Sequence, residues 1–99
     1  MFYHVVMMKF KPGTPESFFD ECRAITDRMA KTEKGVRDLR WAKNTADRGK
    51  GYDHAVMGVY DSSADHDAYQ VCDLHVKLKG MVAQYLEDLV VFDTDVPGL

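Results

Sequence analysis

Residues 2–10 read Phe-Tyr-His-Val-Val-Met-Met-Lys-Phe, and this stretch decides the fold class. Aromatic and β-branched residues dominate it and side chains alternate between two faces, which is the pattern of a β-strand. One face is formed by Phe2, His4, Val6, Met8 and Phe10. The other is formed by Tyr3, Val5, Met7 and Lys9. Because both faces are largely apolar, we expect both to be covered, which is the first indication of a partner.

An amphipathic helix is predicted after this strand. Residues 11–13, Lys-Pro-Gly, interrupt the strand, Thr14 is the expected N-cap, and Pro15 takes the first helical position. Apolar side chains then recur at helical spacing at Phe18, Cys22, Ile25 and Met29. Gly35 is the expected end of the helix.

Two further strands are predicted in the middle of the chain. Residues 36–44 place Leu39 and Trp41 on one face. In residues 52–60, one face carries His54, Val56, Gly58 and Tyr60. The polar, glycine-containing residues 44–51 between them predict a loop.

A helix in two parts and a final strand are predicted for the last third of the chain. The residues Asp61, Ser62 and Ser63 are expected to cap the first part, which falters near Cys72 and Asp73. The expected elements are a helix over 64–69, a helix over 75–87, a strand over 89–93 and a tail over 96–99.

The predicted order β-α-β-β-α-β is that of the ferredoxin-like α+β fold, with a four-stranded antiparallel sheet in a single domain over residues 1–99. We expect the first and third strands to be parallel neighbours at the centre and both helices to cover one face. The second face would then be bare and apolar. Pairing with a second copy through that face would close a dimeric α/β barrel around a small-molecule pocket.

Composition excludes several classes of protein. The 99 residues carry a net charge of −3 with acids and bases interleaved, so neither a nucleic-acid partner nor a membrane is expected. Because the first residues follow a strand pattern, no signal peptide is expected there. Cys22 and Cys72 form no CxxC motif and are expected to be reduced, which predicts a cytoplasmic location.

Four side chains are the candidates for chemistry. His4 and His54 each begin a predicted strand, and parallel strands would bring their imidazoles together. Tyr69 and His75 flank the helix break, and a kink there would let them act as oxyanion donor and general base. The plainer alternatives are hydrogen-bonded strand histidines, a core tyrosine and a surface histidine.

The remaining polar residues predict no cofactor and no metal site. Asp65, His66 and Asp67 are consecutive, so their side chains splay around a helix, and His66 is expected at its surface. Asp73 could orient His75 but is expected to be a helix cap. No glycine-rich phosphate loop and no zinc-ligand spacing is present.

Four segments together resemble the stress-responsive dimeric α/β-barrel (Dabb) family over about residues 3–95. They are His4 to Lys11, Gly51 to His54, Tyr69 to His75 and Leu89 to Asp93. The resemblance implies a dimeric ferredoxin-like fold. It also implies a cofactor-free site like that of a plant polyketide cyclase in the family, with His75 as base, Tyr69 as oxyanion donor, and His4 and His54 in substrate binding.

Three hypotheses about function follow. The first is a cofactor-independent cyclase or lyase acting on a β-keto, polyketide-like substrate. The second is a non-catalytic dimer that binds a small apolar or phenolic ligand or is associated with stress. A third, less favoured, is a haem or quinol monooxygenase, since nothing among the four histidines identifies a haem ligand.

Overall fold

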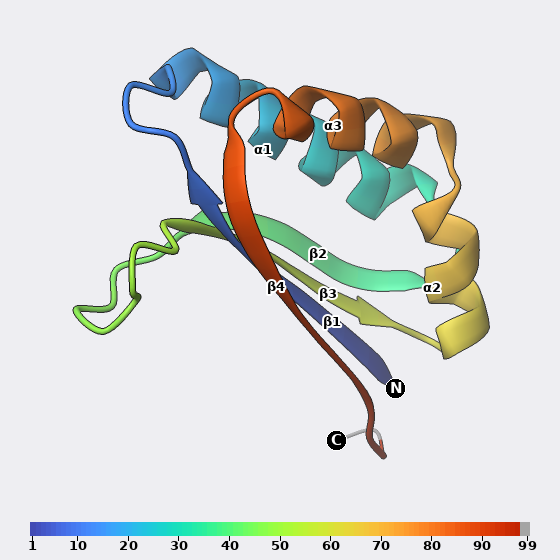
Figure 1. The fold of residues 1–99 in the computed structure, drawn as a ribbon. Helices are drawn as coiled ribbons and strands as arrows, with labels where there is room; N and C mark the ends of the chain where they lie inside the picture. Colours follow the sequence, from blue (N-terminus) through green and yellow to red (C-terminus); the bar gives the residue numbers. More distant parts are fainter. Residues whose placement is uncertain (98–99) are drawn as a thin grey trace.

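A four-stranded sheet covered on one face by helices makes up the computed structural model, which describes residues 1–97 (Figure 1). The elements are β1 (Phe2–Phe10), α1 (Glu16–Thr32), β2 (Val36–Lys43), β3 (His54–Tyr60), α2 (Ser63–Gln70), α3 (Asp73–Ala83) and β4 (Leu86–Asp95). This is the predicted ferredoxin-like α+β fold, with the second helix divided in two. Gly98 and Leu99, the end of the expected tail, lie outside the described residues.

The strand order is β2-β3-β1-β4, and every neighbouring pair is antiparallel. The expectation that β1 and β3 are parallel was therefore wrong. The crossover through α1 makes β1 and β2 run the same way, while β2 and β3 are joined by a hairpin and run oppositely. Because β3 is inserted between β1 and β2, it must oppose both. His4 consequently lies opposite Gly58, and His54 lies opposite Met8.

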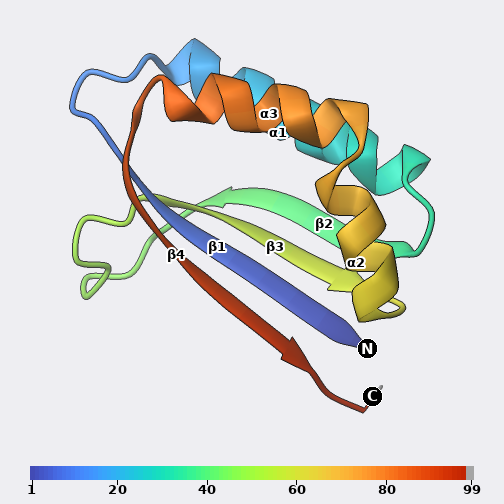
Figure 2. The same ribbon diagram turned by 45° about the vertical axis from the view of Figure 1, so that its right-hand side comes forward.

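The break in the second helix occurs where it was predicted. Helix α2 ends at Gln70, and α3 begins at Asp73 with Cys72 as its N-cap. Figure 2 shows α3 running along the sheet beside α1, whereas α2 turns across the end of the sheet. This turn places the junction of α2 and α3 above the start of β1.

The boundaries of α1, α3 and β4 differ from the prediction. Pro15 rather than Thr14 is the N-cap of α1, because the Thr14 hydroxyl donates to the Lys11 carbonyl oxygen at 2.6 Å instead. Helix α3 ends at Ala83, and β4 begins at Leu86, three residues early. The Lys11 amide donates to the Tyr85 carbonyl oxygen at 2.8 Å, so the end of β1 draws this segment away from the helix.

The hydrophobic core lies between the sheet and helices α1 and α3. Its buried members include Met8, Phe10, Phe19, Cys22 and Met29. Burial raises the pKa of the Cys22 thiol to about 12, so this free cysteine packs as a small apolar side chain, as predicted.

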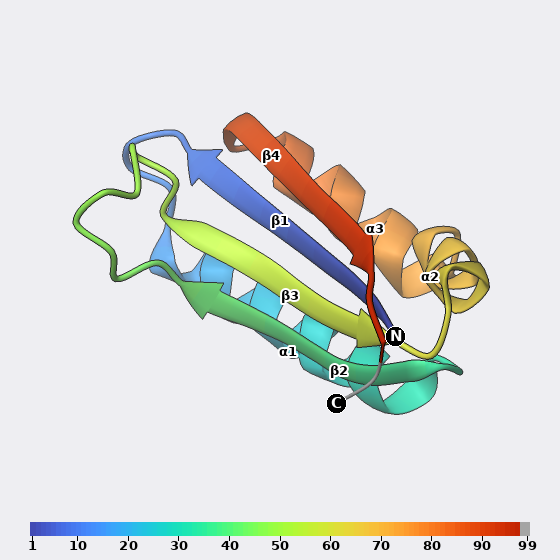
Figure 3. The ribbon, with the colours of Figure 1, turned by 90° about the horizontal axis from the view of Figure 1, so that it is seen from below.

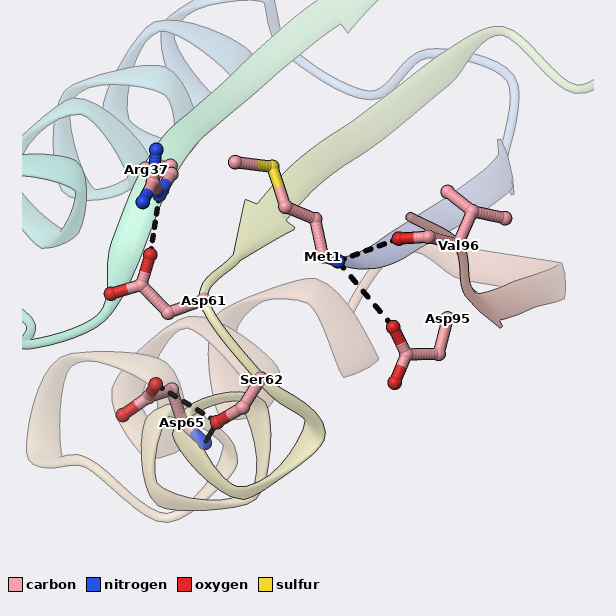
Figure 4. A network of polar contacts seen from close by, with 7 residues as sticks. All are labelled: Met1, Arg37, Asp61, Ser62, Asp65, Asp95 and Val96. Atoms are coloured by element: carbon pink, nitrogen blue, oxygen red, sulfur yellow. Dashed lines mark hydrogen bonds and ion pairs between the residues drawn. The ribbon is translucent and has the colours of Figure 1, made fainter. Parts of the chain in front are cut away.

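Polar contacts secure the end of the sheet next to α2 (Figure 4). The N-terminal ammonium of Met1 donates to the Val96 carbonyl oxygen at 2.6 Å and lies 3.5 Å from the Asp95 carboxylate. Ser62 caps α2, because its hydroxyl oxygen accepts from the Asp65 amide at 3.2 Å. The Met1 contacts tie the start of β1 to the end of β4, and the Ser62 contact fixes the first turn of α2.

The second face of the sheet carries no helix among the described residues (Figure 3). The register places six apolar side chains there, namely Val5, Met7, Met57, Val59, Val90 and Phe92. Met57, Val90 and Phe92 are 42%, 50% and 61% exposed. We call these six residues the bare-face patch. Within residues 1–97, no helix has the length and apolar character needed to cross a membrane.

Two glycines should respond oppositely to alanine. Gly35 has φ +79°, and a Cβ there would lie 2.2 Å from the Asp65 Cγ, so Gly35→Ala should lower the free energy of unfolding by at least about 1–2 kcal/mol. A Cβ at Gly80 in α3 meets nothing within 4 Å, so Gly80→Ala should raise it by about 0.5–1 kcal/mol. Urea unfolding midpoints measure both. An unchanged midpoint for Gly35→Ala would show that this turn is not constrained as described.

Candidate functional site

A cavity of ≈ 310 Å³ lies between the sheet and α3, on the helix-covered side. Most of its lining is apolar and includes Val6, Met8, Val56, Leu78, Val82 and Leu86. The polar lining residues are His4, Tyr69, Gln70, His75 and Lys79. This cavity lies within one chain and on the side of the sheet away from the bare-face patch. The pocket expected between two paired sheets stays a prediction.

Tyr69 and His75 converge at this cavity, as predicted. Six residues apart, they would point in directions about 120° apart around a regular helix. The break between α2 and α3 removes that constraint, and their ring centroids lie 4.6 Å apart. Both side chains are buried, with 2% and 9% exposed.

The surroundings of His75 favour the neutral imidazole with one defined tautomer. Its Nδ1 lies 2.9 Å from the Gln70 carbonyl oxygen, which can only accept, so Nδ1 carries the proton and Nε2 a lone pair. Burial lowers the pKa of His75, and the Lys79 charge contributes in the same direction. His75 is therefore available as a base at neutral pH. Its partner is this carbonyl rather than Asp73.

Tyr69 is kept in its protonated form. Burial raises the pKa of Tyr69 to about 12, so its hydroxyl remains a hydrogen-bond donor throughout the physiological range. The ring of Tyr60 packs against it with centroids 5.2 Å apart. A neutral base and a neutral donor thus meet at one cavity wall.

His4 lies in a different polar cluster at the same end of the sheet. Its Nδ1 contacts the carboxylate of Asp93, which lies directly opposite on β4. Its ring lies 4.3 Å from that of His66, centroid to centroid. His66 is only 6% exposed, so the expected surface position was wrong. Because Tyr69 is buried three residues later, both side chains share the face that α2 turns toward the sheet.

His54 is separated from His4 by the antiparallel pairing. The two lie on the same face but four residues apart along β1, which is roughly 14 Å. The His54 ring stacks on Phe19 with centroids 3.8 Å apart and lies beside Phe10. Among the described residues, His54 is not part of the cavity lining. The predicted approach of His4 and His54 does not occur.

Lys79 and Trp41 are among the cavity residues that the sequence analysis missed. Lys79 lies one helical turn after His75, and this i, i+4 spacing could have indicated a charge near the base. The loop cations considered from the sequence, Lys43, Arg48 and Lys50, do not line the described cavity. Trp41 also lines it, and its buried Nε1 has no hydrogen-bond partner within residues 1–97.

The sequence matches the family model of the Stress responsive A/B Barrel Domain (Dabb) over residues 2–96. The chain belongs to this family. The resemblance recognised in the sequence is therefore confirmed over residues 2–96. No curated protein matches the sequence significantly.

Solved structures agree with this assignment at the level of the fold. A dimeric ferredoxin-like protein of unknown function from Jannaschia sp. CCS1 is 24% identical, with a TM-score of 0.85 over 96% of this chain and 98% of that chain. The hydroxynitrile lyase of Passiflora edulis is 17% identical, with a TM-score of 0.83 over 99% and 94%. An antibiotic biosynthesis monooxygenase-like protein from Nitrosomonas europaea is 15% identical, with a TM-score of 0.82 over 97% and 98%.

The burial of His75 predicts a pH-dependent stability of known sign. Its pKa is lowered in the folded state, so below the ordinary value of about 6.5 the unfolded chain binds the proton more readily. The contribution of His75 to stability is complete above that pH and is lost as pH falls through the lower folded value. The urea midpoint can be measured from pH 7.5 to pH 5 in steps of about one pH unit. It should fall less in His75→Gln than in the wild type.

NMR titration gives the direct measurement. All four histidines are buried, so the reference must be the same residue in the urea-unfolded chain rather than a surface histidine. A His75 that titrates alike in the folded and unfolded chains would contradict the described environment.

Proposed function

We propose that this Dabb protein is a homodimer and that each cavity carries out cofactor-independent cyclase or lyase chemistry on a β-keto, polyketide-like substrate. The observation that carries the proposal is the pairing of a neutral, oriented His75 with a protonated Tyr69 at one wall of an apolar cavity. The cavity volume of ≈ 310 Å³ lies at the lower end of those that hold small organic molecules.

The proposed reaction begins with proton transfer. Nε2 of His75 removes a proton from the carbon between two carbonyl groups of the substrate, and the electron pair of that C–H bond forms an enolate. The Tyr69 hydroxyl donates a hydrogen bond to the developing oxyanion. The enolate carbon then attacks a second carbonyl of the same molecule, and the proton held by His75 returns to the new alkoxide, so no net charge or electron is consumed.

Two other residues take supporting parts in the proposal. His4 lies at the polar end of the cavity and would orient a substrate oxygen. Lys79, exposed at the cavity, would attract an acidic or enolate group. His54 is left out because it is enclosed by the aromatic core. One of the fold neighbours is a hydroxynitrile lyase, which supports lyase chemistry in a protein of this fold. The proposal does not assign the substrate of that enzyme to this chain.

Turnover of a linear poly-β-keto thioester tests the chemistry. His75→Gln should lower kcat by about 10²–10⁴-fold, since it removes the base. Tyr69→Phe should lower kcat by about 10²–10³-fold with little change in KM, because its hydrogen bond strengthens mainly in the transition state. Lys77→Gln, an exposed neighbour on α3, is the matched control and should keep wild-type kinetics.

The alternative function is a non-catalytic small-ligand binder. It would be correct if a phenolic or β-keto ligand binds without turnover and His75→Gln only weakens that binding. The monooxygenase hypothesis predicts instead a shifted Soret band when haem is added.

The homodimer follows from the bare-face patch. Its apolar side chains extend across three strands and lack cover within the described chain, which in a folded domain marks an interaction surface. A second copy supplies a matching apolar sheet face through a two-fold axis. The Jannaschia neighbour, described as dimeric, provides support at the level of the fold.

A charged side chain placed in the bare-face patch should separate the protomers. Placing a charge in the patch, as in Phe92→Lys, should convert a species of twice 11.3 kDa into a monomer in light scattering coupled to gel filtration. Val71→Lys is the matched control, because Val71 is 75% exposed but lies at the end of α2, away from the patch. A monomeric wild type would contradict the homodimer. A dimer that persists in Phe92→Lys but is lost in Val71→Lys would place the interface away from the bare-face patch.

A further inference from the structure

Three potential metal ligands from three separate elements meet beside the cavity. His4 belongs to β1, His66 to α2 and Asp93 to β4. One ligand atom from each can be chosen so that all of them lie within 4.8 Å of one another. The cross-strand register sets His4 opposite Asp93, and the turn of α2 across the sheet end brings His66 onto His4.

The surroundings of the two histidines are apolar and aromatic. His4 and His66 are 4% and 6% exposed, and the His66 ring lies 4.8 Å from that of Phe2 and 5.0 Å from that of Tyr60, measured between centroids. The nearby Asp93 carboxylate supplies the negative charge that a buried cation requires.

We propose that His4, His66 and Asp93 bind a divalent transition-metal ion such as Zn²⁺. Two imidazole nitrogens and one carboxylate oxygen suit Zn²⁺ and its neighbours in the first transition row, whereas Mg²⁺ and Ca²⁺ prefer all-oxygen sites. Bonds of about 2.0–2.2 Å place the ligand atoms about 3.4 Å from one another. The wider separations in the cluster would therefore close slightly, and the direct contact between His4 and Asp93 would open. The remaining coordination positions are left to water or a bound molecule.

Neighbouring contacts fit a metal-bound arrangement. The Gln70 side-chain amide nitrogen lies 2.8 Å from Nε2 of His66. Turning this amide over would let its oxygen accept from Nε2–H, which orients the ring and leaves the Nδ1 lone pair for the metal. The Asp93 side chain is 39% exposed, which gives an ion a route from solvent to the buried histidines. The ion would take the place of the direct contact between Nδ1 of His4 and the Asp93 carboxylate.

The site is separate from the dimer surface, and although it shares His4 with the proposed reaction, it needs neither His75 nor Tyr69. All three ligands lie on the helix-covered side of the sheet, opposite the bare-face patch, so each protomer would hold its own ion. His4 also lines the cavity, so the ion would sit at the cavity edge. The metal site does not depend on His75 acting as a base, and either inference can fail without the other.

Zn²⁺ titration of the full-length, tag-free protein by isothermal calorimetry tests the site, with one ion expected per chain. His66→Ala and Asp93→Asn should each weaken binding by at least about 10–100-fold, because each removes a ligand. His75→Gln and Asp95→Asn are matched controls, one the other cavity-lining histidine and the other a carboxylate two residues along the same strand. Both should bind Zn²⁺ as the wild type does.

Two further readouts keep the test decisive if a variant is unstable. Co²⁺ should give visible absorption bands typical of nitrogen and oxygen ligands at low coordination number, and these should be absent in Asp93→Asn. Zn²⁺, unlike Mg²⁺, should raise the Tm of the wild type. Equal Zn²⁺ affinity in wild type, His66→Ala and Asp93→Asn would overturn the proposal, as would loss of binding only in His75→Gln.

Discussion

The insertion of β3 between β1 and β2 is the constraint on which the rest of the molecule depends. The α1 crossover makes β1 and β2 parallel, and the hairpin that follows must place β3 antiparallel to both of them. Right-handed crossovers then put α1 and α3 on the same side of the sheet. The sheet therefore has one face with a core and a cavity and another face that remains apolar and bare.

A second, local constraint organises the chemistry. The interruption between Gln70 and Asp73 costs helical hydrogen bonds but frees Tyr69 and His75 from the spacing of a regular helix. The carbonyl oxygen of Gln70, near the end of α2, accepts a hydrogen bond from Nδ1–H of His75. The same turn directs His66 toward His4. One break thus serves two polar groups, the Tyr69–His75 pair and the histidine–carboxylate cluster.

Burial determines what these polar groups can do. The apolar surroundings lower the pKa of His75 and raise that of Tyr69, so a base and a donor coexist without charge. His54 occupies an equally buried position but is enclosed by Phe10 and Phe19, away from the cavity. His4 and His54 lie on neighbouring strands but have different surroundings. The strand register, and not the residue type, decides which side chain lies at the cavity.

The sequence by itself determined the element types, the fold class and the helix break, because these depend on alternation, helical spacing and capping within short segments. It also indicated a bare apolar face and the convergence of Tyr69 with His75. The tertiary structure alone decided that β1 and β3 are antiparallel, that β4 begins at Leu86, and that His54 lies outside the cavity. It likewise decided that His66 is buried against His4 and Asp93. Such contacts join residues up to 89 positions apart, and only strand register and helix placement bring them together.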